Sequence, residues 1–206
     1  MGRMSRDSCD KTRLEVTING LLFSFSQTLG CATIRGIAMF SLGILTISTR
    51  SYAGTQEDLS GATIKRVLGS AGYTLQRQEI VSDNKEMITK NLVRWSDTEQ
   101  LNLVVTSGGT GLSARDVTPE AVSLVIEREV PGLSEAMRVQ TFRKTPMAML
   151  SRSIAGTRGS TLIVALPGSP KAVEECLRVI MPVLPHALEV LSGKVVGHSG
   201  DLKTGA

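Results

Sequence analysis

The stretch from residue 101 to residue 121, LNLVVTSGGTGLSARDVTPEA, decides the fold, because it joins an apolar run to a helix start through a glycine-rich turn. The β-branched run at residues 101–106 predicts a buried strand of a parallel sheet. The glycines within residues 108–111 permit positive φ and close backbone approach, so successive N–H groups can form an anion-binding nest. Thr118 and Pro119 then predict an N-cap and a first helical position. The stretch therefore predicts a strand, a turn suited to phosphate and a helix in succession.

The same alternation of apolar runs and helical patterns continues on both sides of this stretch. Further strands are predicted at residues 42–47, 74–81 and 161–166. The resulting β-α-β-α-β order implies right-handed crossovers and a parallel sheet with helices on both faces. We therefore predict an α/β fold, a three-layer αβα sandwich around a mostly parallel sheet.

Residue types at the helix ends predict where the helices begin and end. Asp58 or Ser60 caps a first helix, and Asp83 opens a second, amphipathic one. Pro170 begins a third helix, and a last helix ends at Gly193.

The first 40 residues differ from the rest of the chain. An apolar patch at residues 21–25 resembles part of a signal sequence, but Arg35 and scattered polar residues prevent an apolar span of about 20 residues. Two interpretations stay open: a targeting or regulatory extension, or an over-long start assignment or poorly ordered tail, which we favour. The predicted organisation is an N-terminal extension at 1–40, one domain at 41–193 and a flexible C-terminal tail at 194–206.

Composition restricts the class of protein. Hydrophobic residues make up 41% and charged residues 20%, as in ordinary globular domains, and aromatics at 3% argue weakly against a nucleic-acid reader. The net charge of +4 suits anionic partners such as phosphates without deciding anything alone. The three scattered cysteines do not have the spacing of a zinc site or a disulfide framework. The chain has only two histidines, which leaves few candidates for the histidine of a Ser-His-Asp hydrolase. We expect a cytoplasmic protein that contacts neither nucleic acid nor membrane.

A glycine-rich turn by itself is as consistent with a tight turn before a capped helix as with a ligand site. Arg115 and Asp116, between the turn and the helix, favour the ligand site. A cation and a carboxylate beside a turn suited to phosphate are what the handling of nucleotide and Mg²⁺ needs. The turn is not a Walker A motif, which needs a lysine after its last glycine, nor is it a dinucleotide fingerprint.

Residues 106–121 resemble the signature of the molybdopterin-binding superfamily, which includes the Mog-type adenylyltransferases and the G domains of gephyrin and its plant counterparts. The similarity continues in TPMAMLSRSIAG at 145–156 and LPGSP at 166–170. It covers the chain from residue 42 to residue 191 in the family's order. Three motifs in register are far stronger than one glycine turn.

The resemblance implies a molybdopterin adenylyltransferase of molybdenum cofactor biosynthesis, which transfers AMP from Mg-ATP to the terminal phosphate of molybdopterin. Asp83 and Asp116 match two acidic positions of the family and are the implied catalytic residues and Mg²⁺ ligands. The implied residues for binding substrate and nucleotide are Ser48, Thr49, Gly108, Gly109, Thr110, Gly111, Arg115, Ser151, Ser153, Gly168 and Ser169.

Some of these positions keep a structural interpretation as well. An aspartate before a helix, such as Asp83, is also an ordinary cap. Arg152 or Arg158 would hold anionic oxygens together with the nearby serines, but each is equally readily a solvated or structural charge. The turn at 166–170 suits an anion at a helix N-terminus and a simple strand–helix connection equally well.

One position departs from the family's pattern. After the first strand the family usually has Ser-Asp, whereas this chain has Ser48 and Thr49. A hydroxyl can still form hydrogen bonds, but it brings no negative charge to a metal ion. The alternative function is therefore a catalytically weak carrier or scaffold paralogue that binds molybdopterin. The resemblance also implies a homotrimer and a molybdate-insertion enzyme as a partner. The apolar residues at 130–133 and in the C-terminal helices suit trimer contacts and core packing equally well.

Overall fold

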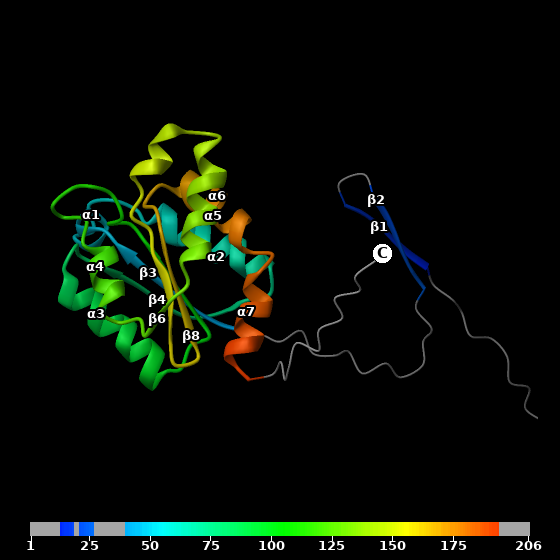
Figure 1. Ribbon diagram of the computed structural model, residues 1–206, viewed down its shortest axis with the longest axis horizontal. Coiled ribbons are helices and arrows are strands. Elements are labelled where there is room, and N and C mark those ends of the chain that lie inside the picture. Colours follow the sequence, from blue (N-terminus) through cyan, green and yellow to red (C-terminus); the bar gives the residue numbers. More distant parts are fainter. Residues whose placement is uncertain (1–12, 19–20, 27–39, 194–206) are drawn as a thin grey trace, which may run out of the picture. The chain divides into compact units, whose positions relative to one another are not determined.

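The computed structural model describes residues 13–18, 21–26 and 40–193 (Figure 1). The chain divides into two units, and the first carries β1 (Arg13–Ile18) and β2 (Leu21–Ser26), two antiparallel strands paired with each other. Apart from these two strands and Phe40, the predicted extension at 1–40 and the predicted tail at 194–206 lie outside the described residues. The predicted division of the chain therefore stays a prediction.

Six strands form the sheet of the second unit, in the order β4-β3-β5-β8-β7-β6. Four neighbouring strands are parallel, namely β3 (Ser41–Ile47), β4 (Thr74–Val81), β5 (Leu103–Ser107) and β8 (Thr161–Leu166). These are the four runs predicted from the sequence, and every residue of β3, β5 and β8 is buried. The predicted mostly parallel α/β sheet is confirmed.

Two short strands that the sequence does not predict complete one edge of the sheet. β7 (Ala155–Arg158) runs antiparallel to β8, and β6 (Arg128–Glu129) runs antiparallel to β7. Neither is long enough to give an apolar run or a regular alternation. The approach of β6 to β7 depends on Gly156, because a Cβ there would lie 2.7 Å from the carbonyl oxygen of Arg128.

Helices cover both faces of the sheet, which confirms the predicted three layers (Figure 1). One face carries α2 (Leu59–Ser70), α6 (Pro170–Ile180) and α7 (Leu184–Leu191), and α5 (Pro131–Phe142) packs against α6. The other face carries α3 (Lys85–Val93) and α4 (Thr118–Ser123), which pack against each other. Among the helices of the described ranges, none is long and apolar enough to cross a membrane.

Most of the predicted helix ends are confirmed. Asp58 caps α2, Pro170 is the first residue of α6, and Gly193 follows α7 with a φ of +69°. The prediction that Asp83 opens α3 is wrong, because Asn84 is the N-cap and its side chain accepts from the backbone of the first turn. The Asp83 carboxylate instead accepts hydrogen bonds from the loop after β3, so a tertiary contact replaces the local cap.

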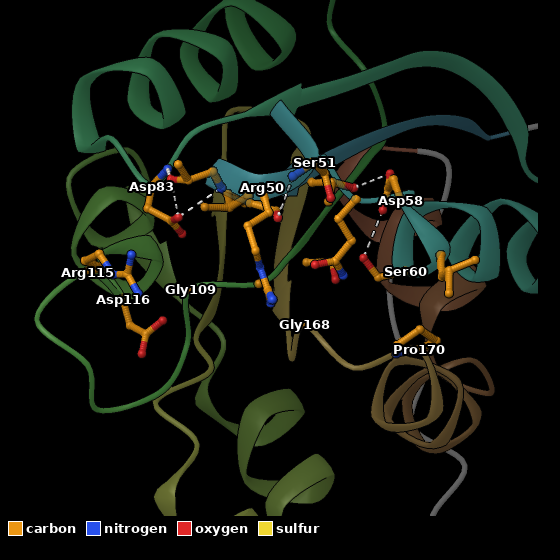
Figure 2. A pocket seen from close by; sticks show the side chains of 18 of the residues that line it. Arg50, Ser51, Asp58, Ser60, Asp83, Gly109, Arg115, Asp116, Gly168 and Pro170 are labelled. Atoms are coloured by element: carbon orange, nitrogen blue, oxygen red, sulfur yellow. Dashed lines mark hydrogen bonds between the residues drawn. The ribbon is translucent and has the colours of Figure 1, made fainter. Parts of the chain in front are cut away.

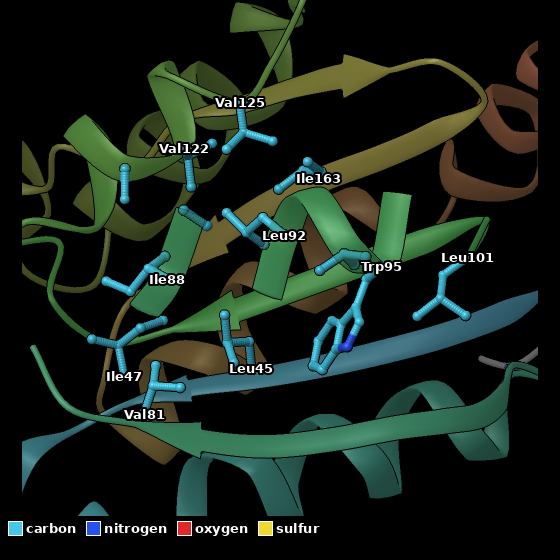
Figure 3. Packing of buried hydrophobic residues seen from close by; sticks show 13 residues of the cluster. Leu45, Ile47, Val81, Ile88, Leu92, Trp95, Leu101, Val122, Val125 and Ile163 are labelled. Carbon is cyan, nitrogen blue, oxygen red and sulfur yellow. The ribbon is translucent and has the colours of Figure 1, made fainter. Parts of the chain in front are cut away.

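The core between the sheet and α3 is centred on Trp95, which belongs to a π-helical turn, η1 (Arg94–Thr98), that extends α3. Its indole is fully buried against aliphatic side chains of the sheet, α3 and α4 (Figure 3). Gly43 in β3 leaves the space for the ring, since a Cβ at this position would lie 2.8 Å from Trp95 Cε3. This packing fixes α3, and with it the loop after β4, against the sheet.

Candidate active site

A cavity of about 650 Å³ opens at the carboxyl ends of the parallel strands, where sheets of this kind bind ligands (Figure 2). Its walls come from the loops after β3 and β4, the start of α2, the glycine turn after β5 and the turn before α6. The predicted site residues that line this first cavity are Ser48, Thr49, Asp83, Gly108, Gly109, Arg115, Asp116 and Gly168.

A second cavity of about 600 Å³ lies on the other side of the glycine turn. It is lined by the remaining predicted site residues, which are Thr110, Gly111, Ser151, Ser153 and Ser169. Apolar side chains of α5 and of the 3-10 helix η2 (Pro146–Leu150), including Met137 and Met147, form much of the rest of its wall. Gly109, Asp116 and Gly168 line both cavities. The fold thus brings every predicted site residue to one of two adjoining cavities.

The glycine turn has a conformation that only glycine adopts easily. Gly108 and Gly109 have φ values of +100° and +62°, and a Cβ on Gly108 would lie 2.3 Å from the carbonyl oxygen of Ile47. Thr118 stabilises the turn, since its hydroxyl donates to the carbonyl oxygen of Gly108 at 2.8 Å. The prediction that Thr118 is the N-cap of α4 is therefore wrong: Val117 takes that position, and Thr118 is the first helical residue.

The loop after the glycine turn is fixed by Asp116 and Arg152. Asp116 Oδ2 accepts from the backbone N–H of Ser113 at 2.9 Å, which closes a local turn. Arg152 donates to the carbonyl oxygens of Gly111, at 2.7 Å, and of Asp116, at 2.5 Å. Its remaining nitrogen donates to Glu120, and that hydrogen bond holds the pKa of the Glu120 carboxyl below its usual value. Arg152 is therefore a structural clamp on this loop, and the anion-binding interpretation is not supported.

Arg158 also takes the structural interpretation. Its guanidinium forms a two-pronged pair with Asp97, with both N–O distances at 2.7 Å, and donates to the carbonyl oxygen of Val125. The hydrogen bond lowers the pKa of the Asp97 carboxyl. Arg158 lines neither cavity, so it joins the end of α4 to η1 rather than contacting a ligand.

Asp83 and Thr49 meet at the wall of the first cavity, although 34 positions separate them in the chain. The Thr49 hydroxyl donates to Asp83 Oδ2 at 2.6 Å, and the Thr49 backbone N–H donates to the same oxygen at 3.0 Å. Among the described residues, the other oxygen, Oδ1, accepts no hydrogen bond. Asp83 thus presents one carboxylate oxygen that is held and one that is available to a ligand.

Sequence reasoning missed Arg50, a second cation in the first cavity. It lies in α1 (Thr49–Tyr52), whose N-cap is Ser48, and it lines the cavity together with Arg115 (Figure 2). Two guanidinium groups suit a polyanionic ligand. The signal was present in the sequence, because Arg50 immediately follows Thr49, which stands where the family usually has an aspartate.

Asp58 is a second residue whose place in the site was missed. The sequence indicated only its role as a helix cap, which it fulfils by accepting from the backbone N–H of Gly61 at 2.8 Å. Its carboxylate also accepts from the hydroxyls of Thr46 and Ser60 and lines the first cavity. In Figure 2, Asp58 and Ser60 lie at one end of the cavity and Asp83 and Asp116 at the other. The cap also serves as a polar wall of the cavity.

The carboxylates of Asp83 and Asp116 are suited to a Mg²⁺ ion that is already bound to phosphate. Within residues 40–193 no three metal-binding side chains are grouped, so the protein alone does not provide a closed cage. Mg²⁺ is commonly held by one or two carboxylates together with substrate phosphates and water. Asp83 and Asp116 each keep one oxygen, Oδ1, that accepts no hydrogen bond from the described residues. The donor set therefore fits an ion that is also held by the phosphate groups of a ligand.

Comparison with known proteins gives the family. A family model described as a probable molybdopterin binding domain matches residues 43–186. The chain belongs to this family. Among similar members of the molybdopterin-binding family is the molybdopterin adenylyltransferase of Helicobacter pylori strain J99, which is 42% identical over 156 residues, 74% of this chain and 88% of that protein.

Solved structures from the molybdopterin-binding family agree with the fold. The molybdopterin biosynthesis enzyme MoaB of Thermus thermophilus is similar, with 50% identity, a TM-score of 0.72 and coverage of 75% of this chain and 98% of that one. The molybdopterin biosynthesis Mog protein of Mycobacterium ulcerans is similar too, with 37% identity, a TM-score of 0.69 and coverage of 75% and 99%. The family expected from the three sequence motifs is confirmed.

Proposed function

We propose that this protein is a molybdopterin adenylyltransferase of molybdenum cofactor biosynthesis, a nucleotidyltransferase that transfers AMP from ATP to molybdopterin. Relatives of this name align with most of the chain at 32–42% identity. The observation that carries the proposal is the pair of adjoining cavities that share Gly109, Asp116 and Gly168. A transfer between two bound molecules needs two binding spaces with one common wall, where the reacting atoms meet.

ATP fits the first cavity best. The side chains of Arg50 and Arg115 supply positive charge there, and the positive-φ glycines offer backbone N–H groups to phosphate oxygens. Asp83 and Asp116 would hold Mg²⁺ through their available oxygens, directly or through water. When bound, the ion supplies charge neutralisation on the triphosphate.

Molybdopterin fits the second cavity best. Apolar walls that include Met137 and Met147 suit the flat face of a pterin ring. The Ser151 and Ser153 hydroxyls, whose oxygens are 2.9 Å apart, can donate to the polar edge of the ring or to its phosphate. This placement brings the terminal phosphate of molybdopterin toward the glycine turn, on the side opposite the nucleotide.

The reaction needs little covalent chemistry from the protein. An oxygen of the molybdopterin phosphate forms a bond to the α-phosphorus of ATP, the bond from this phosphorus to the bridging oxygen breaks, and pyrophosphate leaves. Arg50 and Arg115 stabilise the charge that develops on the transferred group and on pyrophosphate, while the glycine turn orients the phosphates. Catalysis is thus positioning and electrostatic stabilisation, as in other phosphoryl-group transfers.

A reconstituted assay tests the proposal. Purified protein is mixed with molybdopterin, ATP and Mg²⁺, and both pyrophosphate and the adenylylated product are quantified. We expect product only when all three are present, and unchanged turnover in a Glu135→Gln control, whose carboxylate is exposed and lines neither cavity. Molybdopterin binding without product would instead indicate the carrier alternative that the threonine at position 49 suggests, and no binding would contradict both functions.

A homotrimer and a molybdate-insertion enzyme as recipient of the product remain further proposals. Support comes from apolar side chains exposed on α5 and η2, which are Val139, Phe142, Met147, Met149 and Leu150. Such a group of exposed apolar residues is typical of an interaction surface. Sedimentation equilibrium decides the oligomeric state, with an expected mass of three times the chain mass of 22.0 kDa.

A further inference from the structure

The loops after β3 and β4 are joined at the wall of the first cavity by a group of contacts between Thr49 and Asp83. Asp83 Oδ2 accepts from the Thr49 hydroxyl at 2.6 Å and from the Thr49 backbone N–H at 3.0 Å. The backbone N–H of Asp83 approaches Thr49 Oγ1 in return, at 3.3 Å. We call these three contacts the Thr49–Asp83 clasp. Beside it, the Ser48 N–H donates to the carbonyl oxygen of Val81 at 2.9 Å, so backbone and side chain hold the same two loops.

The clasp determines how the Asp83 carboxylate faces the cavity. A solvated aspartate rotates freely about its terminal torsion, because that torsion has broad minima. Two donors on Oδ2 remove this freedom and leave Oδ1 as the oxygen available to a ligand. The orientation of the Asp83 carboxylate is fixed before a ligand binds, so binding does not have to supply the entropy cost of fixing it.

Thr49 achieves this order without adding charge. A carboxylate in the place of its hydroxyl would stand about as close to Asp83 Oδ2, and two negative charges at that separation need a proton or a cation between them. A neutral hydroxyl donates to the carboxylate directly. Thr49 is also the first residue of α1, so the same contacts connect the backbone of Arg50 to Asp83.

We propose that Thr49 is a positioning residue, which holds Asp83 in the orientation that receives nucleotide-bound Mg²⁺ before any substrate is present. The proposal rests on the proposed function for the role of the ion, and on the clasp for the order of the side chain. Thr49 acts through Asp83 and makes no contact of its own with the metal.

Calorimetric titration of nucleotide tests the proposal, with Mg-ATP in one series and ATP with EDTA in the other. Thr49→Val keeps the shape of the side chain and removes its hydroxyl, which donates to Asp83 Oδ2 and is approached by the Asp83 backbone N–H, while the backbone N–H of residue 49 remains as a donor. We expect it to weaken Mg-ATP binding about ten-fold, as for loss of a hydrogen bond to a charged group, and to leave metal-free ATP binding unchanged. Thr49→Ser, which keeps the donor, should restore Mg-ATP binding to within about two-fold of the original protein.

A double variant separates positioning from a general structural role. In the Asp83→Ala background, Thr49→Val should change Mg-ATP binding by less than about two-fold, because the group it positions is gone. Thr63→Val is the matched control, since its hydroxyl is exposed, donates only to a carbonyl of its own helix and lines neither cavity. The proposal is overturned if Thr49→Val weakens metal-free ATP equally, which would show direct contact, or if its effect persists in the Asp83→Ala background.

Urea denaturation of the same proteins supplies a measure that is independent of any ligand. We expect Thr49→Val and Asp83→Ala each to lower the urea midpoint, and the double variant to lie near the lower of the two rather than at their sum. If the decreases in the urea midpoint of the two single variants add up in the double variant, the coupling between Thr49 and Asp83 is contradicted. If the original protein bound no ATP in either series, the proposed function would fail, while this denaturation cycle would still decide whether Thr49 orders Asp83.

Discussion

The two oxygens of the Asp116 carboxylate serve the loop and, under the proposed function, a bound Mg²⁺ ion. Oδ2 accepts from the backbone N–H of Ser113 and closes the loop, while Oδ1 accepts no hydrogen bond from the described residues, and the residue lines both cavities. An alanine at this position removes both tasks at once. A change in charge alone is therefore the sharper experiment.

We predict that Asp116→Asn keeps the loop and loses the reaction. The amide oxygen can still accept from Ser113, so the melting temperature should stay within about 2 °C of the original. Turnover in the adenylylation assay should fall at least about 100-fold, because the carboxylate that we propose to hold Mg²⁺ loses its charge. Full turnover in this variant would remove Asp116 from the mechanism.

Gly108 gives a second prediction at the scale of one residue. Gly108→Ala forces a Cβ to within 2.3 Å of a backbone oxygen at a φ of +100°, so we expect a loss of about 2 kcal/mol or more in the free energy of unfolding. Gly69→Ala is the control, because it lies within α2 with open space around it. That change should stabilise by about 0.5–1 kcal/mol. Urea titration of both variants measures the contrast, and equal effects would contradict it.

At the scale of elements, the chain from η2 to β7 holds the glycine loop through Arg152. One guanidinium contacts two backbone carbonyls and a carboxylate, which a lysine ammonium cannot match in geometry. We predict that Arg152→Lys lowers kcat/KM about ten-fold and speeds hydrogen exchange at residues 111–117. Arg178→Lys, in an exposed pair with Glu174, should change neither measurement. Unaltered exchange in Arg152→Lys would show that the clamp is dispensable.

The elements also show which parts of the fold and the site could be predicted. Three of the four parallel strands, β3, β5 and β8, are continuous apolar runs, which located them directly, whereas β4 has polar residues at its centre and was predicted from a less regular alternation. Glycines with proline marked the turn and α4. β6 and β7 were too short to leave a pattern. Asp83 and Thr118 were predicted to be helix caps because capping rules consider only neighbouring residues. They do not predict that Asp83 accepts from the Thr49 hydroxyl or that Thr118 donates to the Gly108 carbonyl oxygen. The partners of Arg152 and Arg158 likewise depend on tertiary geometry.

For the molecule as a whole, burial of two weak acids predicts a loss of stability in alkali. Burial raises the pKa of the Cys176 thiol to about 11 from an ordinary value of 9.0, and that of Tyr73 to about 12 from 10.0. Between pH 9 and 11 the unfolded chain loses a thiol proton that the folded chain keeps, so the free energy of unfolding falls as pH rises. Tyr73 continues this trend between pH 10 and 12.

Melting curves from pH 8 to pH 11 measure this effect. Cys176→Ala creates a small gap and lowers stability at every pH, so the slope against pH is the quantity to compare. We expect a shallower decline above pH 9 in Cys176→Ala than in the original protein. Parallel declines would show that the thiol ionises equally easily in both states.

The wall common to both cavities has a consequence for the rate at which the product is released. Adenylylated molybdopterin is one molecule with a nucleotide part and a pterin part, so under the proposed placement of the two substrates it would occupy both cavities at once. The product makes the contacts of two ligands, but its binding costs the translational and rotational entropy of only one molecule. It should therefore dissociate slowly. Rapid-quench experiments should then show a burst of one product per site before a slower steady rate. A protein that accepts the product would then determine the steady-state rate by speeding product release. A linear time course without a burst would show that product release is not slow.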